Sequence, residues 1–491
     1  MKQRLSGARS TTNKVTDNKQ MITRVKGFWK HLNVTPEKFF LIVGGIFGLL
    51  LIGITPPLQT PDEATHFLRA YQVSQLGFVG TNDDGVIGGY LPVSFEKTQA
   101  LVDTEPVIEF NPGAKYNLHK TIAALKIDLD ENTTEFETVG GAVTYSPVGY
   151  IPQAIGIAIG VLLNLPPILL MYIARVANLI VWLLLIYGAI KLLPYKKWAL
   201  VGVALLPMLV AQSGSPGVDM LSIGLATVFI TYILKLRAQS LVSNKSLLFI
   251  FLLGCAIALT KQTTILVLGF VFLLKMNQFS GTRTKTIMTF IALIMVPILV
   301  SIGWGILTSH LNLVAAAGVP GQNSSQQLIG LINEPWRLPK VIFNTFFFDW
   351  GDGVVGALIG SFGWLDTPLS SGLVMIGYVT LAFLLFTNYE KPKLPLRRTD
   401  VWVITSILAL YVVGTMAALY ITYAPVGFGV FYGLQGRYFL LALIMAIPLF
   451  WSTPIKIAKQ HYVTFLKVAM VTLLIASALT IYLRYYVTVV F

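Results

Sequence analysis

Two neighbouring acids, a histidine and an arginine occur close together in residues 55–71, whose sequence is TPPLQTPDEATHFLRAY. A carboxylate in such a group can act as a general base that removes a proton from an attacking hydroxyl. His66 follows Asp62 by four residues and Glu63 by three, so in a helix the three side chains share one face. We therefore take Asp62 as the first candidate for a catalytic base and Glu63 as the second, with His66 and Arg69 as substrate contacts. The alternative is that the acids only start a helix, where the helix dipole favours negative charge.

The flanking elements must hold this group at the edge of a membrane. Residues 39–54 form an apolar run close to the length of a spanning helix. Pro56, Pro57 and Pro61 then end that helix, because proline lacks an amide donor and clashes with the preceding turn. We expect a second helix over residues 62–75, which places the acids at the boundary between membrane and water.

Composition places the chain among integral membrane proteins. Of its 491 residues, 55% are hydrophobic and only 12% are charged, and several apolar runs approach the ~20 residues that span a bilayer. The net charge of +14 does not indicate nucleic-acid binding, because Lys and Arg fall in short loops between apolar runs. The single cysteine, Cys255, excludes an intramolecular disulfide.

The positions of the basic residues predict the orientation in the membrane. Residues 1–38 are basic and polar and are predicted to be a disordered cytoplasmic tail, and residues 39–491 a single transmembrane domain. Within it, residues 55–167 are expected to form a large external loop with juxtamembrane helices. Residues 145–163 have the length either to span or to lie on the surface. We place them on the surface, because only then do all the later basic loops stay cytoplasmic.

The expected fold is an all-α polytopic membrane protein with about eleven, and at most thirteen, transmembrane helices. The expected spans are residues 39–54, 168–190, 199–213, 218–236, 246–260, 262–274, 286–308, 369–386, 401–421, 437–451 and 463–484. Residues 336–348 are amphipathic enough to form a second surface helix. Neither surface helix changes the side of the membrane on which the large loop over residues 55–167 is predicted to lie.

Further polar and aromatic residues fall on the same predicted side as Asp62. They are Asp219, Lys261, Trp364, Asp366, Tyr423, Gln435, Arg437 and Tyr438. Lys261 and Arg437 are candidates for holding a phosphate leaving group, as cations do in phosphate recognition. The other six are candidate substrate contacts, and the aromatic rings among them have the shape to stack on a sugar.

Each of these residues also has a plainer interpretation. Lys261 and Arg437 suit interfacial anchors whose charged heads reach water. Asp219 suits a helix start, Asp366 a turn before Thr-Pro, and His66 a packed surface histidine.

The sequence contains no Walker loop, CxxC, HExxH or GxSxG motif, and no cofactor is firmly indicated. Asp62, Glu63 and His66 leave open a divalent metal, Mg or Mn, but their spacing is weak support for it.

Three blocks of the sequence together resemble a known family. They are PPLQTPDEATHFLRAY from residue 56, SFGWLDTPL from residue 361 and LQGRYF from residue 434. Over about residues 40–450 the chain is similar to bacterial polytopic membrane proteins of unknown function that are grouped with the GT-C glycosyltransferases.

That resemblance implies a GT-C fold with an acidic residue just after the first helix, matched here by Asp62 or Glu63. It implies a second acid in the next external loop, matched by Asp219. It also implies a polyprenyl-phosphate-linked sugar donor and inversion at the anomeric carbon. Many GT-C relatives carry an external soluble domain at the C-terminus. Because this chain ends soon after its last helix, residues 55–145 are expected to recognise the acceptor.

The sequence therefore predicts an inverting glycosyltransferase at the outer face of a bacterial plasma membrane. It would transfer a sugar from polyprenyl phosphate to a cell-envelope glycan or a lipid-linked acceptor. Two alternatives stay open, a transporter or flippase of a lipid-linked sugar and a non-catalytic scaffold of an envelope-synthesis complex. A transporter is expected to carry ionisable residues at mid-membrane depth, and a scaffold makes Asp62 dispensable.

Overall fold

The computed structural model defines most of the chain after the basic tail. It describes residues 34–103, 108–311, 319–349, 351–392, 395–453 and 455–487. Residues 1–33 of the tail expected over residues 1–38 lie outside the described residues. Its last positions are helical, because α2 (Pro36–Ile54) begins at a proline, whose fixed φ suits the first turn of a helix.

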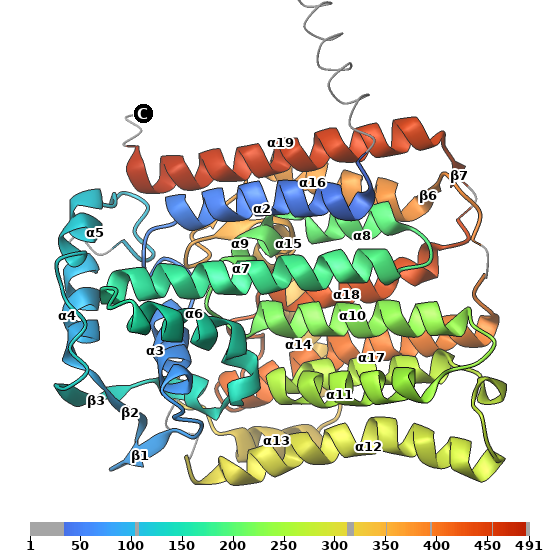
Figure 1. Ribbon diagram of the computed structural model, residues 1–491, viewed down its shortest axis with the longest axis horizontal. Helices are drawn as coiled ribbons and strands as arrows, with labels where there is room; N and C mark the ends of the chain where they lie inside the picture. Colours follow the sequence, from blue (N-terminus) through green and yellow to red (C-terminus); the bar gives the residue numbers. More distant parts are fainter. Residues whose placement is uncertain are drawn as a thin grey trace, which may run out of the picture.

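Six helices in the described part of the chain are long and apolar enough to cross a membrane. They are α2, α7 (Pro167–Leu192), α10 (Asp219–Arg237), α12 (Arg283–Leu307), α17 (Arg398–Tyr423) and α19 (Lys459–Tyr486). Figure 1 shows them lying side by side with their axes roughly aligned. This helical bundle is consistent with the expected multi-pass membrane protein.

The other five expected spans are shorter or interrupted. They correspond to α8 (Lys197–Ala204) with α9 (Pro207–Ser213), to α11 (Asn244–Thr260), to the 3-10 helix η3 (Gln262–Leu273), to α16 (Ser371–Phe386), and to η8 (Gly436–Phe439), α18 (Leu440–Ala446) and η9 (Ile447–Phe450) in series. Pro207 starts α9 and Pro448 lies in η9, and proline cannot donate the bond that would continue a helix. The described residues therefore do not confirm a count of eleven to thirteen spans.

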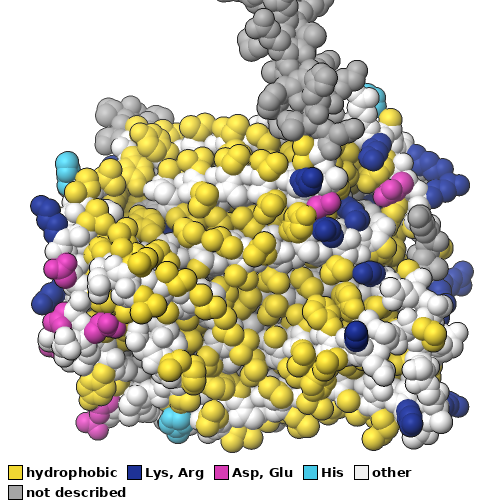
Figure 2. Space-filling view, viewed as in Figure 1, with side chains coloured by type: hydrophobic (Ala, Val, Ile, Leu, Met, Phe, Trp, Pro, Cys, Tyr) yellow, Lys and Arg dark blue, Asp and Glu magenta, His cyan; other side chains and the backbone are white. Residues whose placement is uncertain are grey.

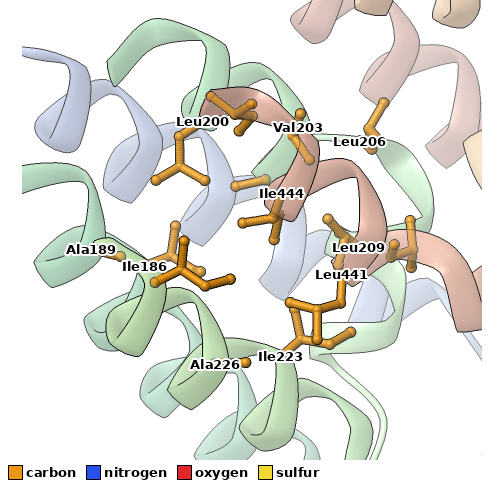
Figure 3. Close-up of a cluster of buried hydrophobic side chains, with 14 of the residues drawn as sticks. Ile186, Ala189, Leu200, Val203, Leu206, Leu209, Ile223, Ala226, Leu441 and Ile444 are labelled. Atoms are coloured by element: carbon orange, nitrogen blue, oxygen red, sulfur yellow. The ribbon is translucent and has the colours of Figure 1, made fainter. Parts of the chain in front are cut away.

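Apolar side chains from several helices fill the centre of the bundle. Figure 3 shows Ile186 of α7, Ile223 of α10, and Leu441 and Ile444 of α18 converging with side chains from α8 and α9. All of these side chains are buried. Since lipid is as apolar as leucine, close packing rather than exclusion of water holds such helices together. The packed centre gives the helix ends fixed relative positions.

The segment between α2 and α7 folds over one end of the bundle, which we call the loop end (Figure 1). Its helices are α3 (Glu63–Ser74), α4 (Val93–Val102), α5 (Leu118–Ala124), η1 (Gly140–Thr144), η2 (Pro147–Tyr150) and α6 (Ile151–Leu162). With twelve residues, α6 is about 18 Å long, which is less than the ~30 Å hydrocarbon core. The surface position expected for residues 145–163 stays a prediction.

The loop end also contains a small three-stranded antiparallel sheet, which the sequence analysis did not expect within a mostly helical protein. The strands β1 (Thr81–Asp83), β2 (Val86–Pro92) and β3 (Thr134–Thr138) pair in the order β1-β2-β3. A tight turn at Asp84 and Gly85, both with positive φ, joins the first two strands. Such turns favour Asp-Gly because both central residues must adopt positive φ.

The remaining described elements are short. They are η4 (Met276–Gln278), η5 (Ser309–Leu311), α13 (Ser324–Asn333), α14 (Arg337–Asn344), η7 (Thr345–Asp349), α15 (Gly351–Ile359), β4 (Ser361–Phe362), β5 (Thr367–Pro368), β6 (Thr387–Asn388) and β7 (Ile455–Lys456). Figure 2 shows Lys and Arg gathered at the end opposite the loop end, with apolar side chains covering the face between.

Candidate functional site

A charged cluster forms where several helix ends meet beneath α3. Asp62 immediately precedes α3, and its Oδ2 lies 3.8 Å from an Arg437 guanidinium nitrogen of η8. The Asp62 side chain is 59% exposed, whereas that of Arg437 is only 9% exposed. Among the described residues, Arg437 forms an ion pair with Asp62, and the Nε atom of Arg437 has no hydrogen-bond partner. An accessible carboxylate therefore faces a largely buried cation.

The position of Arg437 depends on a close approach of η8 to α15. A Cβ added to Gly436 would lie 2.3 Å from the carbonyl oxygen of Val354 and 2.4 Å from the amide nitrogen of Leu358. These atoms belong to the backbone and cannot move aside cheaply. Glycine at position 436 thus allows the contact that holds Arg437 at the loop end.

A second ion pair lies beside the first. Lys261, between α11 and η3, donates from Nζ to Asp219 Oδ1 at 2.6 Å, and Asp219 is the first residue of α10. Both side chains are about one quarter exposed. The Tyr438 ring faces both cations, 5.2 Å from Lys261 Nζ and 5.6 Å from the Arg437 guanidinium carbon. The ring contributes a cation–π contact to each.

His66 connects this cluster to a buried tyrosine. Its Nδ1 lies 2.7 Å from the hydroxyl of Tyr150, which is fully buried at the end of η2. Burial is the main cause that lowers the pKa of His66 below its usual value, and it outweighs the raising effect of Asp62 and Asp219. Arg437 and Lys261 lower this pKa further. A neutral imidazole is therefore favoured at neutral pH.

A small polar cavity of about 20 Å³ opens between these residues. Its lining residues are Pro61, His66, Gln212, Ser215, Gly217, Asp219, Met220 and Arg437. This volume is close to that needed by a single water molecule. The cavity can therefore accept one oxygen-sized group beside the buried guanidinium.

A larger cavity of about 320 Å³ lies on the other side of residues 61–65. Its lining residues are Leu58, Asp62, Glu63, Ala64, Thr65, Glu96, Gln99, Ala100, Asp103, Glu109 and Trp364. Burial raises the pKa of Glu109, and the carboxylates of Asp103, Asp366 and Asp62 raise it further. The cavity is thus acidic, and Asp62 lies between it and the cations.

Glu63 does not share the environment of Asp62. Its two carboxylate oxygens accept hydrogen bonds from Arg175 Nε and Nη2 of α7, at 2.5 and 2.7 Å, and both side chains are almost fully buried. Arg175 also donates to the carbonyls of Ile52, Thr55 and Pro56 at the end of α2. This pair joins α2, α3 and α7. The expectation that Asp62, Glu63 and His66 present one common face is therefore wrong.

Arg69 and Asp366 also have structural partners. The buried Arg69 donates to the carbonyls of Gly77 and Phe78 and to Gln72, which ties the end of α3 to the following turn. Asp366 accepts a 2.8 Å hydrogen bond from Arg484 of α19, and both side chains are 6% exposed. The structure does not bring these two residues into the cluster around Asp62.

The remaining predicted aromatic and amide contacts have mixed positions. Trp364 lines the larger cavity, and its indole nitrogen donates to the Leu58 carbonyl at 3.0 Å, which fixes the ring. Tyr423 is partly exposed and contacts Tyr432, with ring centroids 5.7 Å apart. The Oε1 atom of Gln435 is buried without a hydrogen-bond partner. Of these three residues, only Trp364 lines either cavity.

The backbone around Asp62 is held in an uncommon conformation. Asp62 has φ 59° and ψ 22°, in the left-handed region, and its side chain does not cap α3. Leu58, which lines the larger cavity, and Leu365, which follows its lining residue Trp364, also have positive φ, at 63° and 68°. Such conformations cost about 1–3 kcal/mol each and cluster at functional sites. At Asp62 the strained backbone leaves the carboxylate free of the helix end.

The metal site left open by the sequence does not fit this geometry. Both oxygens of Glu63 are bonded to Arg175, so that carboxylate cannot join Asp62 and His66 around an ion. Within the described ranges, no group of three or more His, Cys, Asp or Glu side chains is arranged to hold a metal.

Sequence reasoning missed several residues of this site. Arg175 lies inside an apolar helix, where a cation is expected to have a partner, but the sequence does not indicate that this partner is Glu63. Tyr150 and Ser215 carry no comparable signal, because each lies in a loop-end segment where a hydroxyl is ordinary. Glu96 and Glu109 fall in the large external loop that the sequence predicts over residues 55–167.

Comparison with known proteins identifies a family but no activity. A family model described as "Predicted membrane protein (DUF2142)" matches residues 46–447, so the chain belongs to this family. No curated protein and no solved structure was found to match the chain.

Proposed function

We propose that this member of the DUF2142 family is a membrane glycosyltransferase of the GT-C type. It would move a sugar from a polyprenyl-phosphate-linked donor to a hydroxyl of a cell-envelope glycan or lipid-linked acceptor, with inversion at the anomeric carbon. The observation that supports this most is the exposed Asp62 carboxylate placed 3.8 Å from the buried Arg437, between a small polar cavity and a larger acidic one.

In this proposal Asp62 is the general base. Its carboxylate removes the proton from the acceptor hydroxyl as that oxygen attacks the anomeric carbon, and the bond to the donor phosphate breaks on the opposite side of the sugar ring. Asp62 suits this role better than Glu63, because the Glu63 oxygens are both bonded to Arg175. Asp62 is also the more accessible of the two acids, with a side chain that is 59% exposed.

The donor phosphate would bind on the cationic side of Asp62. Arg437 has an unpaired Nε and a buried side chain, so it can donate to a phosphoryl oxygen without first breaking a close ion pair. Lys261 is already bonded to Asp219 at 2.6 Å. We therefore assign the main phosphate contact to Arg437, and assign to Lys261 and Tyr438 the placement and electrostatic support of that contact.

The acceptor would bind in the larger cavity. At about 320 Å³ its volume falls at the low end of the range typical of small-molecule sites. Trp364 offers a fixed indole, and Gln99 and Thr65 add neutral polar groups. Carboxylates accept hydrogen bonds from sugar hydroxyls but repel negative charge. A neutral or amino-bearing saccharide fits this wall better than a phosphorylated or uronic-acid one.

The loop end would face the outside of the cell. In this orientation the basic loops at the opposite end of the bundle are cytoplasmic (Figure 2), in line with the positive-inside rule. The donor would then reach the site from the outer leaflet of a bacterial plasma membrane, with its lipid tail among the apolar helices.

Sugar transfer in vesicles provides the test. The full chain is reconstituted with a panel of polyprenyl-phosphate-linked hexoses and an envelope glycan acceptor, and transfer is compared with that of Asp62→Asn. We expect this variant to lose about 10²- to 10⁴-fold in rate, whereas Asp83→Asn on exposed β1 retains the rate. Equal transfer by Asp62→Asn would refute the assignment, and donor crossing the bilayer without any transfer would favour the flippase alternative.

A further inference from the structure

The hydrogen bond between His66 and Tyr150 determines which ring nitrogen of the histidine carries a proton. Tyr150 is fully buried, and among the described residues its hydroxyl has one hydrogen-bond partner, His66 Nδ1 at 2.7 Å. A hydroxyl carries one proton and must donate it to be satisfied. If Nδ1 were the donor, the buried hydroxyl proton would have no acceptor, which is costly. Tyr150 therefore donates and Nδ1 accepts.

A neutral imidazole that accepts at Nδ1 carries its hydrogen on Nε2. Burial, together with Arg437 and Lys261, keeps the pKa of His66 below its usual value and so favours the neutral ring. The Nε2 atom lies close to Gly217, since a Cβ built on that glycine would be 3.7 Å from it, and both Gly217 and His66 line the small cavity. His66 is thus a hydrogen-bond donor toward the cavity and not a proton acceptor.

A second residue of the same cavity, Arg437, has a donor without a partner. The Nε of Arg437 is buried and makes no hydrogen bond in the described part of the chain, and Arg437 lines the cavity together with His66. The cavity has room for about one oxygen atom. Asp219 also lines it, but this carboxylate is held by Lys261 at 2.6 Å.

We propose that the Nε2–H of His66 and the guanidinium of Arg437 form a recess for one anionic oxygen of a phosphate group, with Tyr150 as the residue that positions His66. The proposal rests on the proposed function, because there the phosphate belongs to the polyprenyl donor. Phosphate oxygens accept from fixed N–H donors in this way, and a neutral donor adds a hydrogen bond without adding charge. It also assigns His66 a role other than that of a base.

The test uses the full chain in detergent and measures binding of undecaprenyl phosphate and, separately, inorganic phosphate. His66→Gln keeps an N–H close to the Nε2 position but cannot act as a base, whereas His66→Leu removes the donor. We expect His66→Gln to bind undecaprenyl phosphate within about threefold of wild type and His66→Leu to bind about tenfold more weakly. His119→Leu, an exposed histidine of α5, should not change binding.

Tyr150→Phe supplies an independent readout. In the chain labelled with ¹⁵N-histidine, solid-state NMR should show His66 protonated at Nε2 in wild type and a mixture of tautomers in Tyr150→Phe. Affinity for phosphate should fall with the loss of the single tautomer. Wild-type protonation at Nδ1 would overturn the proposal.

The binding measurements test the recess and the proposed function separately. Unchanged binding by His66→Leu, or binding lost in His66→Gln as fully as in His66→Leu, would overturn the recess. Wild-type binding of inorganic phosphate but not of undecaprenyl phosphate would support the recess and refute the lipid donor. Binding of undecaprenyl phosphate without any sugar transfer would support the recess and refute the proposed transferase. Binding of neither compound overturns the recess.

Discussion

Asp62 and Glu63 are adjacent in the sequence, and each faces an arginine from a distant helix. Glu63 is fully buried and makes two hydrogen bonds with Arg175, whereas Asp62 is 59% exposed and lies 3.8 Å from Arg437. The first pair is closed and satisfied. The second is open, with a spare donor on the arginine and a carboxylate that reaches solvent.

The difference separates a group that stabilises the fold from a group that is free to react. A buried carboxylate whose two oxygens both accept hydrogen bonds from an arginine is not available to a substrate. Moving it away would leave the arginine buried without a partner. The Asp62 carboxylate is accessible and not held in a close hydrogen-bonded pair, so its oxygens remain available to a substrate. We therefore expect substitutions in the two pairs to affect different measurements.

The largest expected effect on stability comes from breaking the closed pair. Glu63→Gln should lower the free energy of unfolding by about 3–5 kcal/mol, because Arg175 is left charged and buried without its carboxylate. Thermal unfolding in detergent measures this change. The exposed pair of α13 and α14 provides a control, since Glu334→Gln should change stability by less than about 1 kcal/mol. A Glu63→Gln protein as stable as wild type would contradict the distinction between the two pairs.

The next effect concerns the open pair. Arg437→Gln should reduce sugar transfer about 100-fold, because the buried donor toward the leaving phosphate is lost, while stability changes much less than in Glu63→Gln. Arg337→Gln, which removes an arginine that pairs only at the surface, serves as the matched control. If both variants transferred sugar equally well, Arg437 would not hold the phosphate.

A smaller effect is expected from pH. The pKa of His66 is lowered by burial, so between that pKa and the ordinary value near 6.5 the unfolded chain binds more protons than the folded one. Stability should therefore fall as pH falls below about 6.5, by at most ~1.4 kcal/mol per pH unit. His66→Gln should lack this part of the pH dependence. If the stability of wild type and of His66→Gln changed equally with pH across this range, His66 would not be the cause of the pH dependence.

The smallest effect concerns the acidic cavity. Removing one charge with Glu109→Gln should raise transfer to a uronic-acid acceptor a few-fold while leaving a neutral acceptor nearly unchanged, because one repulsion of about 1 kcal/mol or less is removed. Competition between the two acceptors in one reaction gives the ratio directly. A ratio equal to that of wild type would mean that the acceptor does not approach Glu109.

The sequence was sufficient for the positions of the long helices and for the candidates at the loop end. Asp62, Lys261 and Arg437 each adjoin an apolar run, so counting runs and basic loops predicted that they lie together. The geometry of the cluster agrees with that grouping. Their roles in chemistry stay predictions.

The pairing within the cluster was beyond such reasoning. Neighbouring residues in a helix point about 100° apart, and a left-handed residue at the helix start turns Asp62 further from Glu63. Only the packing of α2, α3 and α7 shows that Glu63 meets Arg175. The sheet was more accessible, since Asp-Gly at residues 84–85 before the strand over residues 86–92 is a turn signal.

The most direct test measures transfer and thermal unfolding in the same preparations of Asp62→Asn and Glu63→Gln. Our account predicts that Asp62→Asn unfolds close to the wild-type midpoint and transfers almost no sugar. Glu63→Gln should lose stability, and any molecules that remain folded should still transfer. An Asp62→Asn protein that transfers sugar at the wild-type rate would contradict the account.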